Sequence, residues 1–513
     1  MKKLLLTLSL AAVCAVASAK IQMPDIFGDN MVLQRGKPVK VWGTSDASAK
    51  VDVAFGKQTV STKADENGNW SVSLKPMKAA KTPRELNVSE NGKLDKSFKN
   101  VLVGEVWILG GQSNMEYPIK GWNPPNPDAE NVKARANYPL MREISVSGFS
   151  RDKEMKNIKS PSKGWRETTP ENVLKYSAVG FNFSELLMKD LDVPVAMIYT
   201  PLGGSQMCAW IPASDIKKLE FLAQNYERFQ KEVQNYDHKK ALEAHKAAVE
   251  KYHADKKAGK KVPSRPPLVP LADTPRRWQN SPCGLYNARI APIGGFAARG
   301  VLWYQGESDS WTAAEHFEDI FKIMVNSWRN LWKDQSLWFL QVQLTSFETK
   351  THWGQVRQAQ FAATKSLKNC GIVNIIDLGD KTDIHPLNKK DVGKRLENLA
   401  MRKVYKKRGL PNYNTFFYKC KFEKNKATLS LDKSCAKERI NSRGELRGVE
   451  VKVGDAWRAA KNVRLVGNKL IVSDTDSIDG VRYLWKNWAN DDICLFNSSS
   501  IPVFPFVFEN TKK

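Results

Sequence analysis

A serine within residues 110–116, which read Gly-Gly-Gln-Ser-Asn-Met-Glu, stands where a nucleophile could act. Ser113 closely follows an apolar run over 101–109 that predicts a buried strand. A serine on a glycine-flanked turn at the end of a strand can expose its hydroxyl above a sheet. Its backbone N–H then also faces a bound substrate. Ser113 and Glu116 have the spacing of a helix-capping box as well, so a simple helix start is a second interpretation.

A base for such a serine must come from one of only six histidines. Three of them lie in a lysine-rich stretch that is typical of solvated surface. His385 differs, because it follows a strand predicted over 371–378 and is preceded by Asp383. In an extended Asp-x-His the two side chains point to the same face, so the carboxylate can orient the imidazole and stabilise its cation. A loop with an acidic N-cap and a surface histidine is the alternative interpretation.

Two further strand ends carry groups that can stabilise an oxyanion. Residues 303–308 read Trp-Tyr-Gln-Gly-Glu-Ser, in which Gln305 offers a side-chain N–H and Gly306 permits a close turn. Gly203 and Gly204 follow a strand predicted over 193–199 and can supply a backbone N–H. Each feature alone fits an ordinary turn. Together with the first two they indicate one site, because ligands of α/β sheets bind beyond the carboxyl ends of the strands.

These segments resemble the SGNH hydrolases, and specifically the bacterial sialate O-acetylesterases. The resemblance covers nearly the whole chain after its first residues, and it is carried by residues 30–35, 110–115, 303–308, 377–386 and 502–506. It implies that Ser113 is the nucleophile and that Asp383 and His385 form its Asp-x-His pair. The oxyanion hole would consist of the N–H groups of Ser113 and Gly204 and the side chain of Gln305.

The implied mechanism is a two-step acyl transfer. His385 takes the proton of Ser113 during attack on an acetyl carbonyl and then protonates the departing sugar hydroxyl, after which water releases acetate. No metal or organic cofactor is required. O-acetylated sialic acid is the first substrate expected, by resemblance and because a basic protein suits an acidic sugar. Acetylated xylan or another plant polysaccharide is the second. A catalytically silent glycan-binding protein is the alternative from a different functional class.

The same motifs contain residues expected to contact the sugar. The substrate-binding set comprises Gln112, Asn114, Trp210, Tyr304 and Glu307. The aromatic side chains that could stack on a sugar are Trp122, Trp210, Trp303 and Tyr304, although the core is the commoner place for tryptophan. Residues 205–210 read Ser-Gln-Met-Cys-Ala-Trp, where relatives more often carry a Thr and an acidic residue before Ala-Trp. This departure concerns the contacts to the sugar rather than the ester chemistry.

The elements that position these residues predict three domains. Residues 20–100 alternate in the period of a strand, with a hairpin signal at 66–69, and indicate a β-sandwich-like domain. Over 101–410 strands alternate with helices, which predicts a mostly parallel sheet with helices on both faces. The resemblance implies that this α/β domain is SGNH-hydrolase-like, with a flavodoxin-like sheet. Residues 411–513 return to short strands and predict a C-terminal β-rich domain.

An insertion over 215–280 interrupts the α/β domain. It is rich in Lys, Glu and Ala up to residue 253 and in Pro and Lys after residue 256. This composition predicts a charged helical arm followed by an extended return, with no chemistry of its own.

Residues 1–19 have the pattern of a cleaved secretory signal, since a basic start precedes an apolar run over 4–16 and Ala17-Ser18-Ala19. We therefore expect an exported protein, periplasmic or extracellular, that begins near Lys20 and has no membrane anchor. The formal charge of +26 is not accompanied by a basic motif with interleaved aromatics, so nucleic-acid binding is not expected. The lysines are spread throughout the chain, as on a solvated surface.

The cysteines show no C-x-x-C spacing, so a zinc or redox site is not expected. Of those that follow the predicted signal, Cys420 and Cys435 are the closest in sequence. They are therefore the best candidates for a disulfide, although spacing alone does not determine pairing.

Overall fold

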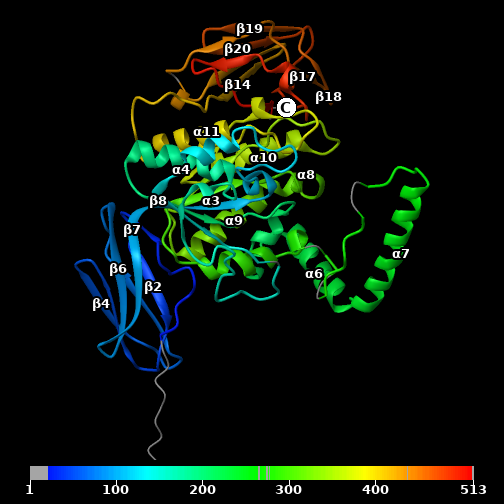
Figure 1. The fold of residues 1–513 in the computed structure, drawn as a ribbon. Helices are drawn as coiled ribbons and strands as arrows, with labels where there is room; N and C mark the ends of the chain where they lie inside the picture. The colour runs from blue at the N-terminus through cyan, green and yellow to red at the C-terminus, as the bar shows by residue number, and fades with distance from the viewer. Residues whose placement is uncertain are drawn as a thin grey trace, which may run out of the picture.

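A large mixed β-sheet forms the centre of the molecule (Figure 1). The computed structural model describes residues 21–510 except 149, 264–265, 273–274, 277 and 436, so the predicted signal at 1–19 lies outside the described residues. From one edge, the strand order is β13 (Cys370–Val373), β12 (Trp338–Val342), β11 (Gly300–Tyr304), β7 (Lys93–Gly111), β10 (Val195–Tyr199), β8 (Tyr138–Ser145) and β9 (Arg166–Thr168). All neighbours in this order pair in parallel except β8 and β9.

Helices cover both faces of the parallel strands, as the alternation of elements predicts. Successive residues of β7 point to opposite faces. Trp107 and Leu109 belong to an apolar cluster with α4 (Ala178–Leu191) and α11 (Lys389–Lys403), whereas Val106 and Ile108 belong to a cluster with α9 (Phe317–Trp332) and α10 (Trp353–Ser366). Burial on both faces explains why these strands are almost continuously apolar. The shorter helices are α1 (Ser113–Glu116), α2 (Ala129–Arg135), α3 (Pro170–Val173), α5 (Ala213–Ile216) and α8 (Asp309–Thr312).

Strand β7 continues from the N-terminal strands into the central sheet. Its first half pairs with β6 (Ala80–Glu90) and β1 (Val32–Gln34), and its second half pairs with β10 and β11. The boundary predicted at residue 100 therefore falls inside one strand. The sequence changes there because the strand passes from a half-exposed sheet to one covered on both faces. The other N-terminal strands are β2 (Val39–Thr44), β3 (Lys50–Phe55), β4 (Gln58–Lys63) and β5 (Asn69–Leu74).

A buried carboxylate on β7 fastens the N-terminal strands to the central sheet. Glu105 is fully buried and accepts hydrogen bonds from Nε of Arg35 at 2.6 Å and from Nε of Arg299 at 2.9 Å. Burial alone would raise the pKa of Glu105, but the hydrogen bonds and charges of the two arginines outweigh this effect and lower it. The segment 30–35 that contributed to the family resemblance thus includes a structural anchor, Arg35.

We expect Glu105→Ala to lower the free energy of unfolding by up to about 3–5 kcal/mol, because it leaves two partly buried arginines without their counter-charge. The pKa of Glu105 is depressed, so the stabilisation is present above the ordinary pKa of a glutamate and is lost as the pH falls through the lowered value. Urea unfolding at neutral pH measures the difference. Glu66→Ala, in an exposed turn, is the control and should change stability by less than about 0.5 kcal/mol. Equal effects of the two substitutions would contradict the anchoring role.

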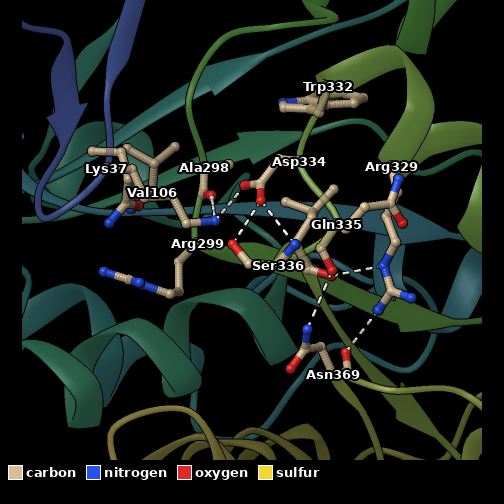
Figure 2. A network of polar contacts seen from close by, with 12 residues as sticks. Lys37, Val106, Ala298, Arg299, Arg329, Trp332, Asp334, Gln335, Ser336 and Asn369 are labelled. Carbon is tan, nitrogen blue, oxygen red and sulfur yellow. Dashed lines mark hydrogen bonds and ion pairs between the residues drawn. The ribbon is translucent and has the colours of Figure 1, made fainter.

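A second polar network reinforces this contact (Figure 2). Nζ of Lys37, in the turn before β2, donates to the carboxylate of Asp334 at 2.6 Å and to the carbonyl of Ala298 at 3.0 Å. The N–H of Ser336 donates to the same carboxylate at 2.8 Å. Because Asp334 lies between α9 and β12, this network connects the N-terminal strands to the amino-terminal end of the parallel sheet.

The charged insertion forms an arm that projects from the side of the molecule (Figure 1). It contains α6 (Glu220–Gln234) and α7 (His238–Lys257), and the chain then returns without regular elements through the described part of 258–277. Among the described residues, we find no helix with the length and apolarity needed to cross a membrane.

The C-terminal part contains three antiparallel sheets, which lie next to α10 and α11 (Figure 1). The first sheet contains β14 (Phe417–Glu423), β15 (Lys426–Leu431), β20 (Lys469–Ser473) and β19 (Asn462–Val466). The second contains β18 (Ala456–Ala459), β17 (Val449–Val453), β21 (Gly480–Tyr483) and β23 (Phe506–Glu509). The third contains β16 (Ile440–Ser442) and β22 (Leu495–Asn497). Cys420 and Cys435 are both free, so the suggested disulfide between them is not formed. The thiol of Cys435 is buried and donates to the carbonyl of Asn414 at 3.3 Å instead.

The strand predicted over 371–378 is shorter than expected. β13 ends at Val373, because the side chain of Asn374 accepts the N–H of Ile376 at 3.1 Å and starts a turn. Asp377 in this turn forms a two-pronged ion pair with Arg395 of α11, at 2.6 and 2.7 Å. The chain that leads to His385 is thereby fixed to the helix that follows it.

Candidate active site

The turn after β7 places Ser113 at the carboxyl end of a central strand. β7 ends at Gly111, and α1 begins two residues later at Ser113. Gly111 has φ +119°, and a side chain there would collide with the carbonyl of Tyr304 on the neighbouring strand. Only glycine fits this position, which explains the glycine before the serine. The capping-box interpretation is wrong, since Gln112 is the N-cap residue and no side chain caps the helix.

Ser113 and His385 meet although they are far apart in the sequence. Nε2 of His385 lies 2.9 Å from Oγ of Ser113. Oδ1 of Asp383 accepts the backbone N–H of His385 at 2.8 Å and lies 3.7 Å from its Nδ1. The segment is not extended as predicted, because Asp380 accepts the N–H groups of Thr382 and Asp383 and bends the chain. Asp383 therefore contacts the backbone of His385 more closely than its ring.

The surroundings of His385 favour a neutral imidazole. Burial lowers the pKa of His385, the positive charge of Lys389 lowers it further, and Asp383 acts in the opposite direction. A neutral imidazole whose Nε2 faces a serine hydroxyl can accept the proton of that hydroxyl. The pair therefore has the geometry and the protonation state that general-base activation requires.

Two backbone N–H groups beside Ser113 can stabilise an oxyanion. Among the described residues, no acceptor is found for the N–H of Ser113 or of Gly204. The N–H of Gly203 is occupied, since it donates to Oε2 of Glu116 at 2.6 Å. A Cβ on Gly203 would lie only 2.8 Å from Oε2 of Glu116, so this glycine allows the loop to approach that carboxylate. Of the two glycines, Gly204 has the free donor.

Gln305 differs from its predicted role in the oxyanion hole. Its side chain is fully buried, and Nε2 donates to the carbonyl of Ser205 at 3.1 Å and to the carboxylate of Asp309. Burial raises the pKa of Asp309 to about 6, against the opposing hydrogen bonds from Gln305 and from the N–H of Met207. The carboxylate of Asp309 thus competes with an oxyanion for the amide protons of Gln305. The local sequence motif did not reveal Asp309 as a partner.

An open cavity of about 670 Å³ lies over Ser113 and His385. Of the five residues predicted to contact the sugar, two line this cavity, namely Gln112 and Glu307. The other three lie in the core, with exposed fractions of 1% for Asn114, 0% for Trp210 and 1% for Tyr304. Nε1 of Trp210 donates to Oγ of Ser205 at 3.1 Å, so that tryptophan supports the loop that carries Gly204.

Comparisons with known proteins point to the same chemistry. Residues 267–402 match the family of carbohydrate esterases described as sialic acid-specific acetylesterase. The chain is 23% identical to rat sialate O-acetylesterase over 558 residues, covering 99% of this chain and 98% of that one, and 24% identical to the mouse enzyme over 440 residues, covering 79% and 77%. The crystal structure of a carbohydrate acetylesterase from Xanthomonas citri superposes with a TM-score of 0.76 at 28% identity, covering 96% of this chain and all of the other.

This chain is a carboxylic ester hydrolase related to the sialate O-acetylesterases. The resemblance to sialate O-acetylesterases inferred from its motifs is confirmed, and its relatives support the removal of acetyl esters from glycans. The mixed α/β fold with added β-rich sheets is that of a carbohydrate esterase.

Two exposed tryptophans flank the cavity of this esterase. Trp122 packs edge-on against His385, with ring centroids 5.0 Å apart, and is 43% exposed. Trp311, in α8, is 70% exposed and was not identified from the sequence, although it follows Glu307 by four residues. Apolar rings beside a candidate nucleophile are suited to the face of a sugar ring.

The cavity of this esterase is acidic. Glu116 and Glu307 line it, and no Lys or Arg occurs among the described residues that do so. Burial raises the pKa of both carboxyl groups, while hydrogen bonds from Gly203 to Glu116 and from Asn114 to Glu307 lower it. The cations that act on these carboxyl groups are Arg289 for Glu116 and Lys389 for Glu307, and both are buried.

Proposed function

We propose that this esterase removes acetyl groups from glycans through an acyl-enzyme formed on Ser113. The observation that carries the proposal is the distance of 2.9 Å between Oγ of Ser113 and Nε2 of His385 at the floor of an open cavity. The N–H groups of Ser113 and Gly204 support it further, because both residues line the cavity, no acceptor is found for either N–H among the described residues, and such donors can stabilise an oxyanion.

The chemistry proceeds in two halves. His385 accepts the proton of Ser113 while Oγ attacks the acetyl carbonyl, and the N–H groups of Ser113 and Gly204 stabilise the oxyanion. Collapse of this intermediate breaks the ester bond, and His385 gives its proton to the sugar oxygen that leaves. A water molecule, deprotonated by His385, then releases acetate and restores the serine hydroxyl. Asp383 stabilises the imidazolium and helps to orient its loop.

The strand order supports an SGNH-type, flavodoxin-like core. Without the edge strands β8 and β9, the order is β13-β12-β11-β7-β10. Numbered along the chain, this is the 2-1-3-4-5 order of flavodoxin-like sheets read from β10, with ligands bound at the switch point beside the first strand. Ser113 lies at that point. We propose N-terminal β, α/β and C-terminal β domains, with limited proteolysis as the test of their boundaries.

O-acetylated sialic acid is the first proposed substrate, since the relatives are named for it. The formal charge of +26 would also raise the local concentration of an acidic sugar. A neutral acetylated glycan such as acetylated xylan is the second candidate, and the cavity itself favours it. Glu116 and Glu307 offer no counter-charge to a sialic acid carboxylate, whereas Trp122 and Trp311 suit any pyranose face.

Acetate release from O-acetylated mucin and from acetylated xylan, measured in parallel, separates the two substrates. A kcat/KM at least about tenfold higher on sialic acid esters would support the first candidate, and the reverse preference would support the second. Release from neither glycan would count against the proposed function as a whole.

We expect Trp311→Ala to raise KM for a glycan ester by about fivefold with kcat little changed, because the ring contributes roughly 1 kcal/mol of binding that does not depend on the reaction step. Hydrolysis of p-nitrophenyl acetate, which has no sugar, should be unaffected. Tyr418→Ala removes an exposed aromatic from β14 and serves as the control. Unchanged KM values for glycans in Trp311→Ala would remove this side chain from the binding site.

We further propose that the protein is exported after cleavage near Ala19, on the basis of the signal pattern in residues 1–19. Amino-terminal sequencing of protein purified from its native cell tests this proposal. Finding Met1 at the amino terminus would contradict it.

A further inference from the structure

Three buried polar side chains lie directly beneath Ser113 and His385. Nδ2 of Asn114 donates to Oε1 of Glu307 at 2.5 Å, and Oδ1 of Asn114 accepts from Nζ of Lys389 at 2.6 Å. Asn114, Glu307 and Lys389 are 1%, 3% and 2% exposed. We call these three side chains the buried strut. It connects α1, the loop after β11 and the start of α11.

The buried strut holds the chain on both sides of His385. Nδ2 of Asn114 donates to the carbonyl of Ile384 at 3.0 Å, and Nζ of Lys389 donates to the carbonyl of Pro386 at 2.6 Å. Ile384, before His385, is therefore tied directly to Asn114, and Pro386, after it, is tied to Asn114 through Lys389. A displacement of the His385 loop relative to Ser113 would break one of these bonds.

We propose that Asn114 and Lys389 are positioning residues that fix the imidazole of His385 against Oγ of Ser113. This inference rests on the proposed function, in which His385 is the base. The usual orienting carboxylate is weakly placed here. Asp383 is 41% exposed and lies 3.7 Å from Nδ1, so solvent screens its charge and it makes no hydrogen bond to the ring.

The charged groups around His385 determine the direction in which its pKa should change when the charge of Lys389 is removed. The groups that face it are Asp383 in its own loop, Lys389 on α11, Glu307 after β11 and Glu116 on α1. Burial lowers the pKa of Lys389 to about 7, although Glu307 and Asp383 raise it. The positive charge of Lys389 lowers the pKa of His385, in the same direction as burial does. Removing that charge raises the pKa of His385, because no cation then opposes its protonation.

The burial of Lys389 also distinguishes positioning from simple stabilisation. Taking a lysine and a glutamate out of water is unfavourable, and replacing both groups together by apolar side chains of similar size is often neutral for stability. If the buried strut only stabilised the fold, the charge of Lys389 beneath the cavity would add little to that stability. Its bonds to the Ile384 and Pro386 carbonyls are instead suited to holding the histidine in place.

The test compares Lys389→Met with Lys390→Met, the same substitution at the next residue of α11, which is exposed. The probe is p-nitrophenyl acetate, so that sugar binding does not enter. In Lys389→Met we expect kcat to fall by about thirtyfold or more with KM within about threefold, as for a group that acts in the transition state. The acidic midpoint of kcat/KM should rise by about half a pH unit or more. Lys390→Met should match the unmodified protein in all three quantities.

A second variant covers the possibility that methionine at this site prevents folding. Lys389→Gln is neutral but keeps a polar group for Asn114, and it should show the same upward shift of the acidic midpoint. Unchanged midpoints in folded Lys389→Met and Lys389→Gln would overturn the proposal, and so would the failure of both variants to fold, which would assign Lys389 to stability. Activity retained in Ser113→Ala would instead overturn the proposed function, so the two failures can be told apart.

Discussion

Ser113→Ala is expected to abolish esterase activity, with a loss of about 10⁴–10⁶ in kcat, because no other group forms the acyl-enzyme. The substitution should leave the fold intact. Ser113 is the first residue of α1, and its side chain makes no capping bond that the alanine would lose. Acetate release from p-nitrophenyl acetate and from a glycan ester measures the effect, and thermal unfolding monitors the fold.

The control for this prediction is Ser308→Ala, which removes a hydroxyl from another residue lining the same cavity. It should keep kcat within a few-fold of the unmodified protein. Substantial activity in correctly folded Ser113→Ala would mean that the ester is attacked by another group, such as a water molecule.

His385→Ala is expected to lose nearly as much activity as Ser113→Ala, because the serine hydroxyl is a poor nucleophile without a base at 2.9 Å. The double variant Ser113→Ala with His385→Ala should be no slower than Ser113→Ala alone, since residues that act as one unit give losses that do not add. Rate measurements on all three variants form a double-mutant cycle. Losses that multiply would show that the two side chains act independently.

The sequence predicted those parts of the site that depend on local pattern. The apolar runs that become β10 and β11 end next to Gly204 and Gln305, as expected, since strand ends follow from hydrophobicity and glycine. Ser113 and His385 were singled out by residue type and by position after a strand. The geometry that brings them together depends on the order of strands, which no local pattern contains.

Local sequence patterns could not predict the contacts between segments that are distant in the sequence. The amide of Gln305 is taken by Asp309, so a donor that looked free in its motif is occupied. Trp210 and Tyr304 are apolar enough for the core and pack there. Lys389 gave no signal, because a lysine at the start of a charged helix is ordinarily solvated. Its partner Asn114 lies far away in the sequence.

The most direct test of the central claim is covalent labelling of the intact protein with a fluorophosphonate, followed by mass spectrometry. Attack by Oγ of a serine expels fluoride and leaves a stable phosphonyl ester. We expect one adduct per chain, located by peptide mapping at Ser113, appearing in step with the loss of activity and forming far more slowly in His385→Ala. Full inactivation with the adduct at another residue, or undiminished activity in fully labelled protein, would contradict the account.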